Sequence, residues 1–241
     1  PAPDTAAARA LVAAALAQGR QWLTEPEAKA VCAAYDIPVV VTRTVPADAQ
    51  AAAAEAARIG FPVVIKIHSP DITHKSDVGG VALNLQDEGD VRAAAQAMLA
   101  RVAKSQPQAR LEGFTVQTMV RKPQAQELII GASIDPTFGP VILFGQGGTA
   151  VEVMKDSAMA LPPLNAPLAR ALIERTRVAR LLAGYRDVPP ADLDAVIHTL
   201  TAVSQLLADV PELAELDINP LLVDHAGAVA LDARVRVSNA T

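Results

Sequence analysis

The chain has 241 residues, of which 51% are hydrophobic and 20% charged, a composition typical of a folded protein with one large domain or two lobes. The net charge of −5 and the pI near 5.4 argue against nucleic acid or an anionic membrane as a partner. No apolar stretch approaches the ~20 residues that span a bilayer, and the single Cys32 excludes an internal disulfide, so a reducing cytoplasm is the expected location.

Helices and strands alternate in the first half of the chain. An alanine-rich first helix is expected near the start, where Pro1 stands in place of a methionine and suggests a fragment of a longer protein. Thr24 and Glu27 have the spacing of a capping box, which predicts that a second helix begins there. The elements expected next are a strand over 39–45, a helix over 47–59 that stops at Gly60, strands over 62–67 and 81–85, and a helix over 90–104.

A polar break over 105–113 separates these elements from a strand-rich segment. The pattern as a whole predicts an α+β fold with two lobes and a cleft between them. We divide the chain into an N-terminal helix and linker (1–23), a first lobe (24–112) and a second lobe (113–241). The second lobe is expected to contain three successive antiparallel strands over 114–120, 126–134 and 140–145, helices over 166–183 and 190–209, and a terminal hairpin.

A lysine interrupts the apolar strand PVVIKI. Alternation along a strand places Val63, Ile65 and Ile67 on one face and Lys66 on the other. Burying a lysine costs free energy unless an anion meets its ammonium group, so an anion near Lys66 is one interpretation. A lysine that extends from the strand end into water is the other.

The segment ITHKSDVGG, which follows this strand, favours the anion. His74 and Lys75 lie among serine, proline and glycine residues, which predict an exposed and mobile loop. An imidazole nitrogen can attack phosphorus, cations neutralise a phosphoryl group, and the N–H groups of a glycine-containing turn bind anions. We interpret the loop as one that handles phosphate; a solvated surface histidine is the alternative for His74.

The segment FGQGGTA has the Gly145-x-Gly147-x-x-Ala150 spacing of a dinucleotide-binding fingerprint. The residues after it do not form a helix start, and Pro162-Pro163 interrupts the chain before any second strand with an acidic end. A Walker-type run that ends in Gly-Lys-Ser/Thr is also absent from the sequence. We expect a flexible turn near a ligand, or an ordinary turn of the sheet.

The C-terminal hairpin predicts a metal site. If DHAG (224–227) is a four-residue turn, Val223 pairs with Ala228 and every pair of residue numbers adds up to 451. Asn219 and Asp232 then face each other with Cβ atoms ~5 Å apart. Amide and carboxylate oxygens suit Mg²⁺, which takes few protein ligands; a polar patch on a half-solvated hairpin is the alternative. The opposite face of the hairpin is the expected core face and consists of Ile218, Leu222, Val229, Leu231 and Val235.

Together these motifs resemble the ATP-grasp domain of the NDP-forming acyl-CoA synthetases. The chain is similar to the β-subunit of ADP-forming acetyl-CoA synthetase and, more distantly, to the β-subunit of succinyl-CoA synthetase. The resemblance implies a reaction in which acyl-CoA, ADP and phosphate interconvert with acid, CoA and ATP through a phosphohistidine. It covers about residues 23–237 and rests on the segments FPVVIKIHSPDITHKSDVGGV, VQTMVRKPQAQELIIGASIDPTFGPVILFGQGGTAVEVMKD, LLAGYRD and ELDINPLLV…ALDAR.

The resemblance also implies roles for individual residues. His74 matches the histidine that accepts phosphate and passes it to ADP. Asn219 and Asp232 match the Mg²⁺ ligands, in agreement with the hairpin register. An acidic residue stands at the position of Gln117 in succinyl-CoA synthetase. The implied nucleotide-binding residues are Lys66, Thr73, Lys75, Gln117, Thr118, Met119, Val120 and Glu127.

The CoA and acid sites of this family lie in other domains, so the expected partners are CoA-binding and ligase domains or an α-subunit. Two other functions stay open. One is a ligand-responsive regulatory domain of a protein lysine acetyltransferase, because some family members are fused to acetyltransferase domains. The other is a dinucleotide-binding oxidoreductase, which only the Gly145 fingerprint favours.

Overall fold

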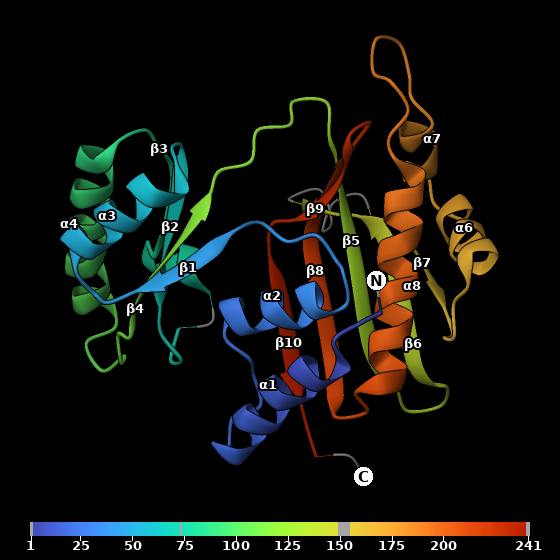
Figure 1. The fold of residues 1–241 in the computed structure, drawn as a ribbon, viewed down its shortest axis with the longest axis horizontal. Coiled ribbons are helices and arrows are strands. Elements are labelled where there is room, and N and C mark those ends of the chain that lie inside the picture. Colours follow the sequence, from blue (N-terminus) through green and yellow to red (C-terminus); the bar gives the residue numbers. More distant parts are fainter. Residues whose placement is uncertain (1, 73, 149–154, 240–241) are drawn as a thin grey trace. The chain divides into compact units, whose positions relative to one another are not determined.

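The computed structural model describes residues 2–72, 74–148 and 155–239. These residues form two compact units, each described below by itself (Figure 1). The central unit is Val40–Arg121, and the terminal unit combines Pro1–Val39 with Lys122–Thr241. In the described part of the chain, no helix has both the length and the apolar character needed to cross a membrane.

The central unit is an antiparallel sheet with two helices packed on it. Its strand order is β1-β4-β2-β3, and α3 and α4 lie side by side against the sheet (Figure 1). The elements are β1 (Thr42–Val45), α3 (Ala49–Ile59), β2 (Val63–His68), the 3₁₀-helix η1 (Lys75–Val78), β3 (Val81–Leu85), α4 (Glu88–Ser105) and β4 (Gly113–Thr118).

Local chemistry sets the ends of these elements. The Gln50 N–H donates to the side chain of Asp48 at the start of α3, and Gly60, with a φ of 95°, ends the helix as expected. The alternation predicted for β2 is confirmed, because Val63 and Ile65 are fully buried in the core of the central unit while Lys66 is half-buried on the other face.

The strand expected over 114–120 pairs differently from the prediction. It is β4, and it lies between β1 and β2 rather than beside the strand that follows it in sequence. Phe114 pairs with Ile67 and Val116 with Ile65, and all four side chains are fully buried. The expected sheet of three successive strands is therefore wrong, because the apolar face of β4 is buried against its distant partners.

The terminal unit is an antiparallel sheet of order β10-β8-β5-β6-β7, with β9 also paired to β8. Within the described residues, one continuous hydrophobic core joins this sheet to five helices from both ends of the chain. The elements are α1 (Thr5–Ala17), α2 (Glu25–Ala34), β5 (Gln126–Asp135), β6 (Gly139–Gln146), β7 (Ser157–Ala160), α6 (Ala166–Glu174), α7 (Val178–Leu182), α8 (Leu193–Asp209), β8 (Leu213–Asp224), β9 (Gly227–Ala230) and β10 (Ala233–Val237).

The compact units do not coincide with the lobes expected over 24–112 and 113–241. Helices α1 and α2 share the hydrophobic core of the C-terminal strands and pack against β10 (Figure 1). Their apolar residues are therefore buried by a partner about 200 positions later in the chain, a pairing that local patterns do not reveal. The boundary near residue 113 also shifts, to Arg121/Lys122, because β4 belongs to the central sheet.

Two helix predictions have different outcomes. The capping box at α2 is confirmed, because the Glu27 N–H donates to Thr24 Oγ1 and the Thr24 N–H donates to Glu27 Oε2. The single helix expected over 166–183 is wrong. The chain forms α6 and α7 instead, because the buried Asp156 accepts the N–H groups of Arg177 and Val178 and so starts a new helix.

Cys32 is fully buried in α2, and burial raises the pKa of its thiol to about 12. A thiol that stays protonated at neutral pH is a packing residue rather than a nucleophile.

The hairpin has the predicted register but not the predicted core face. Relative to β5, β8 carries an irregularity at Asn219–Pro220, so Ile218 pairs with Ile130 and Leu221 with Leu128. Ile218 and Leu221 are both fully buried, which means that the buried face changes sides at this point. Ile218 and Val235 are core residues as expected. Leu222 is also buried, although it is not part of the continuous core of the terminal unit, whereas Val229 and Leu231 are only half-buried.

Candidate functional site

The hairpin of the terminal unit brings Asn219 and Asp232 together. The pairs of β8 with β9 and with β10 follow the predicted register, except for the last pair of β10, Val237 with Leu213, which is shifted by one residue. The Asn219 N–H donates to the Asp232 carbonyl oxygen at 3.3 Å, and the Leu231 N–H donates to the Pro220 carbonyl oxygen at 3.0 Å. The prediction that Asn219 faces Asp232 is therefore confirmed. Both residues are half-buried; Asn219 lies within β8, and Asp232 lies between the end of β9 and the start of β10.

Glu127 and Asn219 converge on Gly148. The Gly148 N–H donates to Asn219 Oδ1 at 2.8 Å. Gly148 has a φ of +70°, and a Cβ atom added to it would overlap Glu127 Oε2, so the Glu127 carboxylate lies directly against this glycine. The Gly147 N–H also donates to the Glu127 carbonyl oxygen at 2.8 Å. The two predicted residues of β5 and β8 are thus joined through a backbone position that only glycine fits.

Two glycines of the FGQGGTA segment, Gly145 and Gly147, let neighbouring backbone segments approach closely. Gly145 lies inside β6, paired with Ile129 and Ser157, so it is not part of a turn. A Cβ atom at Gly145 would overlap the Asp156 carbonyl oxygen, and one at Gly147 would overlap the backbone of β5. Ala150, and the helix start that a dinucleotide fingerprint requires, lie outside the described residues.

The oxygen pair of the hairpin fits a magnesium ion. Asn219 Oδ1 has a second lone pair beyond its bond to Gly148, and Asp232 provides a carboxylate. Within the described ranges, no three His, Cys, Asp or Glu residues gather in a way that could hold a metal ion. A site with two oxygen ligands suits a cation that takes its remaining ligands from phosphate and water, as Mg²⁺ does.

Asp217 extends the acidic character of this face. It pairs with Arg234 across the ladder of β8 and β10, and the two residues lie two positions from Asn219 and Asp232, respectively. Burial raises the pKa of the Asp217 carboxyl, the Arg234 charge opposes this shift, and the nearby Asp232 adds to it.

In the central unit, Lys66 shares a sheet face with Thr115 and Gln117. Lys66 pairs with Thr115 of β4 and with Val81 of β3. Gln117, the first predicted adenine-side residue, follows Thr115 by two positions, so the side chains of the two lie on the same face. Gln117 is buried, at 5% exposure. The structure therefore brings two predicted nucleotide-binding residues of the central unit onto one surface.

Thr115 is a residue that the sequence reasoning missed. It is 1% exposed, and its hydroxyl is a buried polar atom with no hydrogen-bond partner among the described residues. Such groups are rare in folded proteins and call for an explanation. The sequence does show that Thr115 is two positions from Gln117 and therefore on the same face of its strand. It does not show that β4 pairs with the strand of Lys66, which is what places Thr115 beside this lysine.

The segment Thr118–Val120 is held within the central unit. The Thr118 N–H donates to the Val41 carbonyl oxygen at 3.3 Å, and the Met119 N–H donates to the Pro62 carbonyl oxygen at 3.0 Å. Met119 Sδ also accepts the N–H of Asn84 at 3.1 Å. All three residues of the segment are half-buried.

The predicted phosphate loop is exposed at His74, and Lys75 is half-buried at the start of η1. The end of the loop is fixed to β2, because the Gly80 N–H donates to the Lys75 carbonyl oxygen and the Ile67 N–H donates to the Gly80 carbonyl oxygen. Gly79 adopts the left-handed conformation, with a φ of 67°. Thr73 lies outside the described residues.

An ion pair holds the other end of this loop. The Arg110 guanidinium donates to both carboxylate oxygens of Asp71 at 3.1 Å, and the Arg110 backbone N–H donates to Asp71 Oδ2 at 2.8 Å. These hydrogen bonds lower the pKa of the Asp71 carboxyl. His74 is thus exposed between two anchored points, Asp71 and Gly80.

The comparisons with known proteins identify the family. The family model of the ATP-grasp domain matches residues 14–237. The chain belongs to the ATP-grasp family. It is 36% identical to the β subunit of acetate–CoA ligase [ADP-forming] I of Pyrococcus furiosus, over 95% of this chain and 97% of that subunit. It is 44% identical to acetate–CoA ligase [ADP-forming] I of Archaeoglobus fulgidus over 73% of this chain, which is a quarter of the length of that ligase.

Solved structures of this ATP-grasp family agree with the fold. The acetyl-coenzyme A synthetase 1 of Ca. Korarchaeum cryptofilum, in complex with coenzyme A and Ca-AMPCP, matches with a TM-score of 0.91 at 37% identity, over 96% of this chain and 100% of that chain. A complex of the same synthetase with Mg-AMPPCP has its phosphohistidine segment pointing towards the nucleotide-binding site. It matches at 35% identity with a TM-score of 0.83, over the same shares of the two chains.

These findings confirm the predicted α+β ATP-grasp fold and the relationship to ADP-forming acetyl-CoA synthetase β-subunits. The relatives are NDP-forming acid–CoA ligases, and this chain corresponds to their ATP-grasp part. The comparisons support neither of the two other functions, a regulatory domain of a protein lysine acetyltransferase or a dinucleotide-binding oxidoreductase. The roles of the individual site residues stay predictions.

Proposed function

We propose that this chain is the nucleotide-binding, phosphoryl-transfer part of an ADP-forming acid–CoA ligase, which interconverts acyl-CoA, ADP and phosphate with acid, CoA and ATP. The observation that carries the proposal is the pair of oxygen ligands, Asn219 and Asp232, opposed across the hairpin beside Glu127. The match along almost the whole Pyrococcus subunit supports it.

The nucleotide contacts divide by chemistry. Lys66 and Lys75 bind the negatively charged phosphates, and Thr73 belongs to the same loop. The segment Gln117–Val120, with Thr118 and Met119 at its centre, borders the adenine. Glu127 borders the nucleotide on the side of Gly148, whose N–H group fixes the amide of Asn219.

Asn219 and Asp232 hold Mg²⁺, which when bound neutralises phosphate charge. His74 carries the phosphoryl group. Its imidazole nitrogen attacks the phosphorus of a first phosphohistidine held by the partner domains, so that the donor N–P bond breaks as the new N–P bond forms and the donor histidine is released. An oxygen of the ADP β-phosphate then attacks the same phosphorus as the His74 N–P bond breaks, which gives ATP. The two lysines stabilise the charge on the transferred group, so catalysis here is positioning and neutralisation.

The acid and CoA sites belong to partner domains or to an α-subunit. The part of the Archaeoglobus ligase that matches this chain is a quarter of that ligase, which leaves room for such domains. A cytoplasmic location stays a prediction from the composition. The experiment below therefore uses the complete enzyme rather than this part alone.

The test of the relay replaces His74 with alanine, with His225→Ala as a matched control. His225 is also an exposed histidine, in the turn between β8 and β9. We expect His74→Ala to abolish phosphate-dependent ATP formation and to leave ADP·Mg²⁺ binding within about twofold, because the histidine transfers phosphate without holding the nucleotide. His225→Ala should keep both. ATP formation by His74→Ala at the wild-type rate would contradict the relay.

The test of the metal site replaces Asp232 with asparagine, which keeps the shape of the side chain and removes its charge. We expect ADP·Mg²⁺ to bind about 10–100-fold more weakly, the range typical when a group that supports a metal site is lost. Binding of ADP without Mg²⁺ should change little. Equal losses in the presence and absence of Mg²⁺ would show that Asp232 does not hold the metal.

A further inference from the structure

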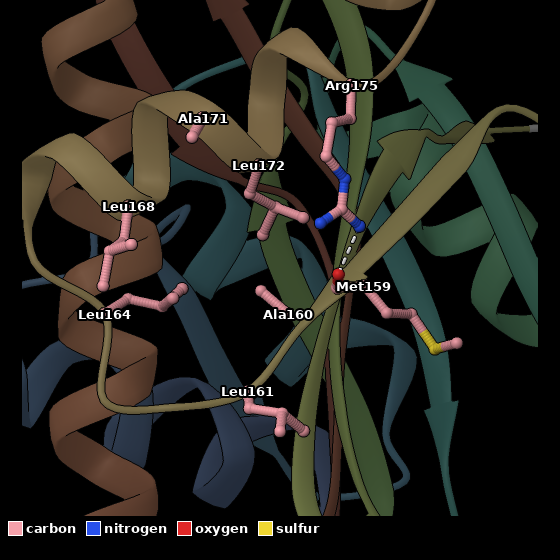
Figure 2. A pocket seen from close by; sticks show the side chains of 8 residues that line it. All are labelled: Met159, Ala160, Leu161, Leu164, Leu168, Ala171, Leu172 and Arg175. Carbon is pink, nitrogen blue, oxygen red and sulfur yellow. Dashed lines mark hydrogen bonds between the residues drawn. The ribbon is translucent and has the colours of Figure 1, made fainter.

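The terminal unit has a pocket between β7 and α6 that the proposed function does not use. Its volume is about 380 Å³. Figure 2 shows Ala160 and Leu172 near its centre, with Leu161 and Arg175 towards opposite ends. None of the lining residues is among those assigned to the nucleotide, the metal or the phosphoryl group. The lining consists of Met159, Ala160, Leu161, Leu164, Leu168, Ala171, Leu172 and Arg175.

The walls of this pocket are apolar side chains exposed to an unusual degree. Met159 is 57% exposed, Leu161 53% and Leu168 50%, although each lies beside fully or almost fully buried neighbours such as Leu172. A group of exposed large apolar residues around a hollow marks a binding surface more often than single exposed residues do. The volume lies within the ~300–1,000 Å³ typical of small-molecule sites.

Arg175 provides the only charged side chain of the lining. It extends from the end of α6 across the pocket, and its guanidinium donates to the backbone carbonyl oxygen of Met159 (Figure 2). Among the described residues, Arg175 has no carboxylate partner. A guanidinium has five N–H donors, so donors remain for an anion beside the apolar wall.

We propose that this pocket binds an aliphatic carboxylate. The carboxylate accepts hydrogen bonds from Arg175, and the alkyl chain lies against Leu164, Leu168 and Leu161. An aliphatic carboxylate complements a pocket that has one guanidinium at one end and apolar walls elsewhere. Its binding would remove exposed apolar surface from water and would pair the Arg175 charge with a carboxylate. The proposal is independent of the phosphoryl-transfer function, because it involves other residues.

The size of the pocket argues for a small ligand rather than a protein partner. A stable protein interface takes about 20–30 residues from each side. The eight lining residues fall well short of this number, and four of them come from a single short helix and its end. A fatty-acid-like ligand needs no more surface than the pocket offers.

The direct test measures binding of sodium octanoate to the full chain by isothermal titration calorimetry. We expect saturable binding to one site. Each methylene removed from the chain should weaken binding about fourfold, so hexanoate, which is two methylenes shorter, should bind about 16-fold more weakly than octanoate. Octanamide has the same chain without the charge and should bind at least about tenfold more weakly, because it loses the charge-assisted hydrogen bonds to Arg175.

Two variants and a matched control locate the site. Arg175→Gln removes the charge and should weaken octanoate binding at least about tenfold, whereas Ala171→Leu fills the pocket and should weaken hexanoate and octanoate alike. Arg170→Gln changes another exposed arginine of α6 that does not line the pocket, and should leave binding unchanged. All variants should bind ADP·Mg²⁺ like the wild type, which separates this site from the nucleotide site and shows that the variants are folded.

Several outcomes would overturn the proposal. They are binding of octanoate that does not saturate, octanamide binding as tightly as octanoate, and unchanged octanoate binding by Arg175→Gln. A chain that binds no octanoate but sediments as a dimer, and that Ala171→Leu turns into a monomer, would identify a second copy as the occupant instead. If the wild-type chain does not bind ADP·Mg²⁺, the proposed function is refuted, but the octanoate results still decide whether this pocket binds a carboxylate.

Discussion

Gly148 allows the sharpest test of the site in the terminal unit. Replacing it with alanine has two separable effects. The first is on the backbone, because a φ of +70° disfavours any residue with a Cβ atom by about 1 kcal/mol. The second is on the site, because the new methyl group would occupy the position of Glu127 Oε2.

Gly139→Ala is the matched control. Gly139, the first residue of β6, has nearly the same backbone angle, a φ of +74°, and no atom lies within 4 Å of an added Cβ. Both variants should therefore lose about 1 kcal/mol of unfolding free energy, or roughly 2–4 °C in Tm for a chain of this size. The Glu127 carboxylate is the end of a flexible side chain and can rotate away from the new methyl group, so the overlap adds little to the loss of stability.

Binding should separate the two variants. In Gly148→Ala the displaced carboxylate of Glu127, and the altered position of the N–H group that holds Asn219, should weaken ADP·Mg²⁺ binding about 10–100-fold. Gly139→Ala should bind within about twofold of the wild type. The measurements are thermal unfolding and calorimetric titration of ADP·Mg²⁺. If both variants bind equally well, Glu127 and Asn219 do not act together around Gly148, and the reasoning is refuted.

Two further predictions concern buried or paired polar groups. Thr115→Val removes a buried hydroxyl that lacks a partner among the described residues, so we expect urea unfolding to show a gain of about 1 kcal/mol; a loss of that size would mean that the hydroxyl is satisfied in solution. Lys122→Met removes the hydrogen bond that lowers the pKa of Asp224. A lowered pKa stabilises the fold above the unfolded pKa, and this stabilisation is lost as the pH falls through the folded pKa. The variant should therefore be less stable than the wild type at pH 7, and the difference should shrink as the solution is made acidic. A difference in stability that does not change with pH would assign the loss to packing.

Much of the candidate site could be predicted because the features involved are local. The capping box of α2 depends on Thr24 and Glu27, three positions apart, and the structure confirms it. The pairing of Asn219 with Asp232 could be counted from a four-residue turn, because a short turn fixes the register of both strands that leave it. The alternation that puts Lys66 on the face away from the core follows from the period of a strand.

What local patterns left undetermined depends on partners far apart in the chain. Strand β4 lies between β1 and β2, and that arrangement alone puts Thr115 beside Lys66. The irregularity at Asn219–Pro220 is visible only in the pairing of β8 with β5, and it brings Leu221 opposite Leu128 in the core of the terminal unit.

Turns, helix starts and the residue pairs that a short loop forces together are thus readable from local segments, because neighbours along the chain set their geometry. Which strands meet is settled by the folded chain as a whole, and so are the contact of Glu127 with Gly148 and the pocket at Arg175. These depend on which distant apolar faces bury each other best, a sum over the whole chain that no short segment contains.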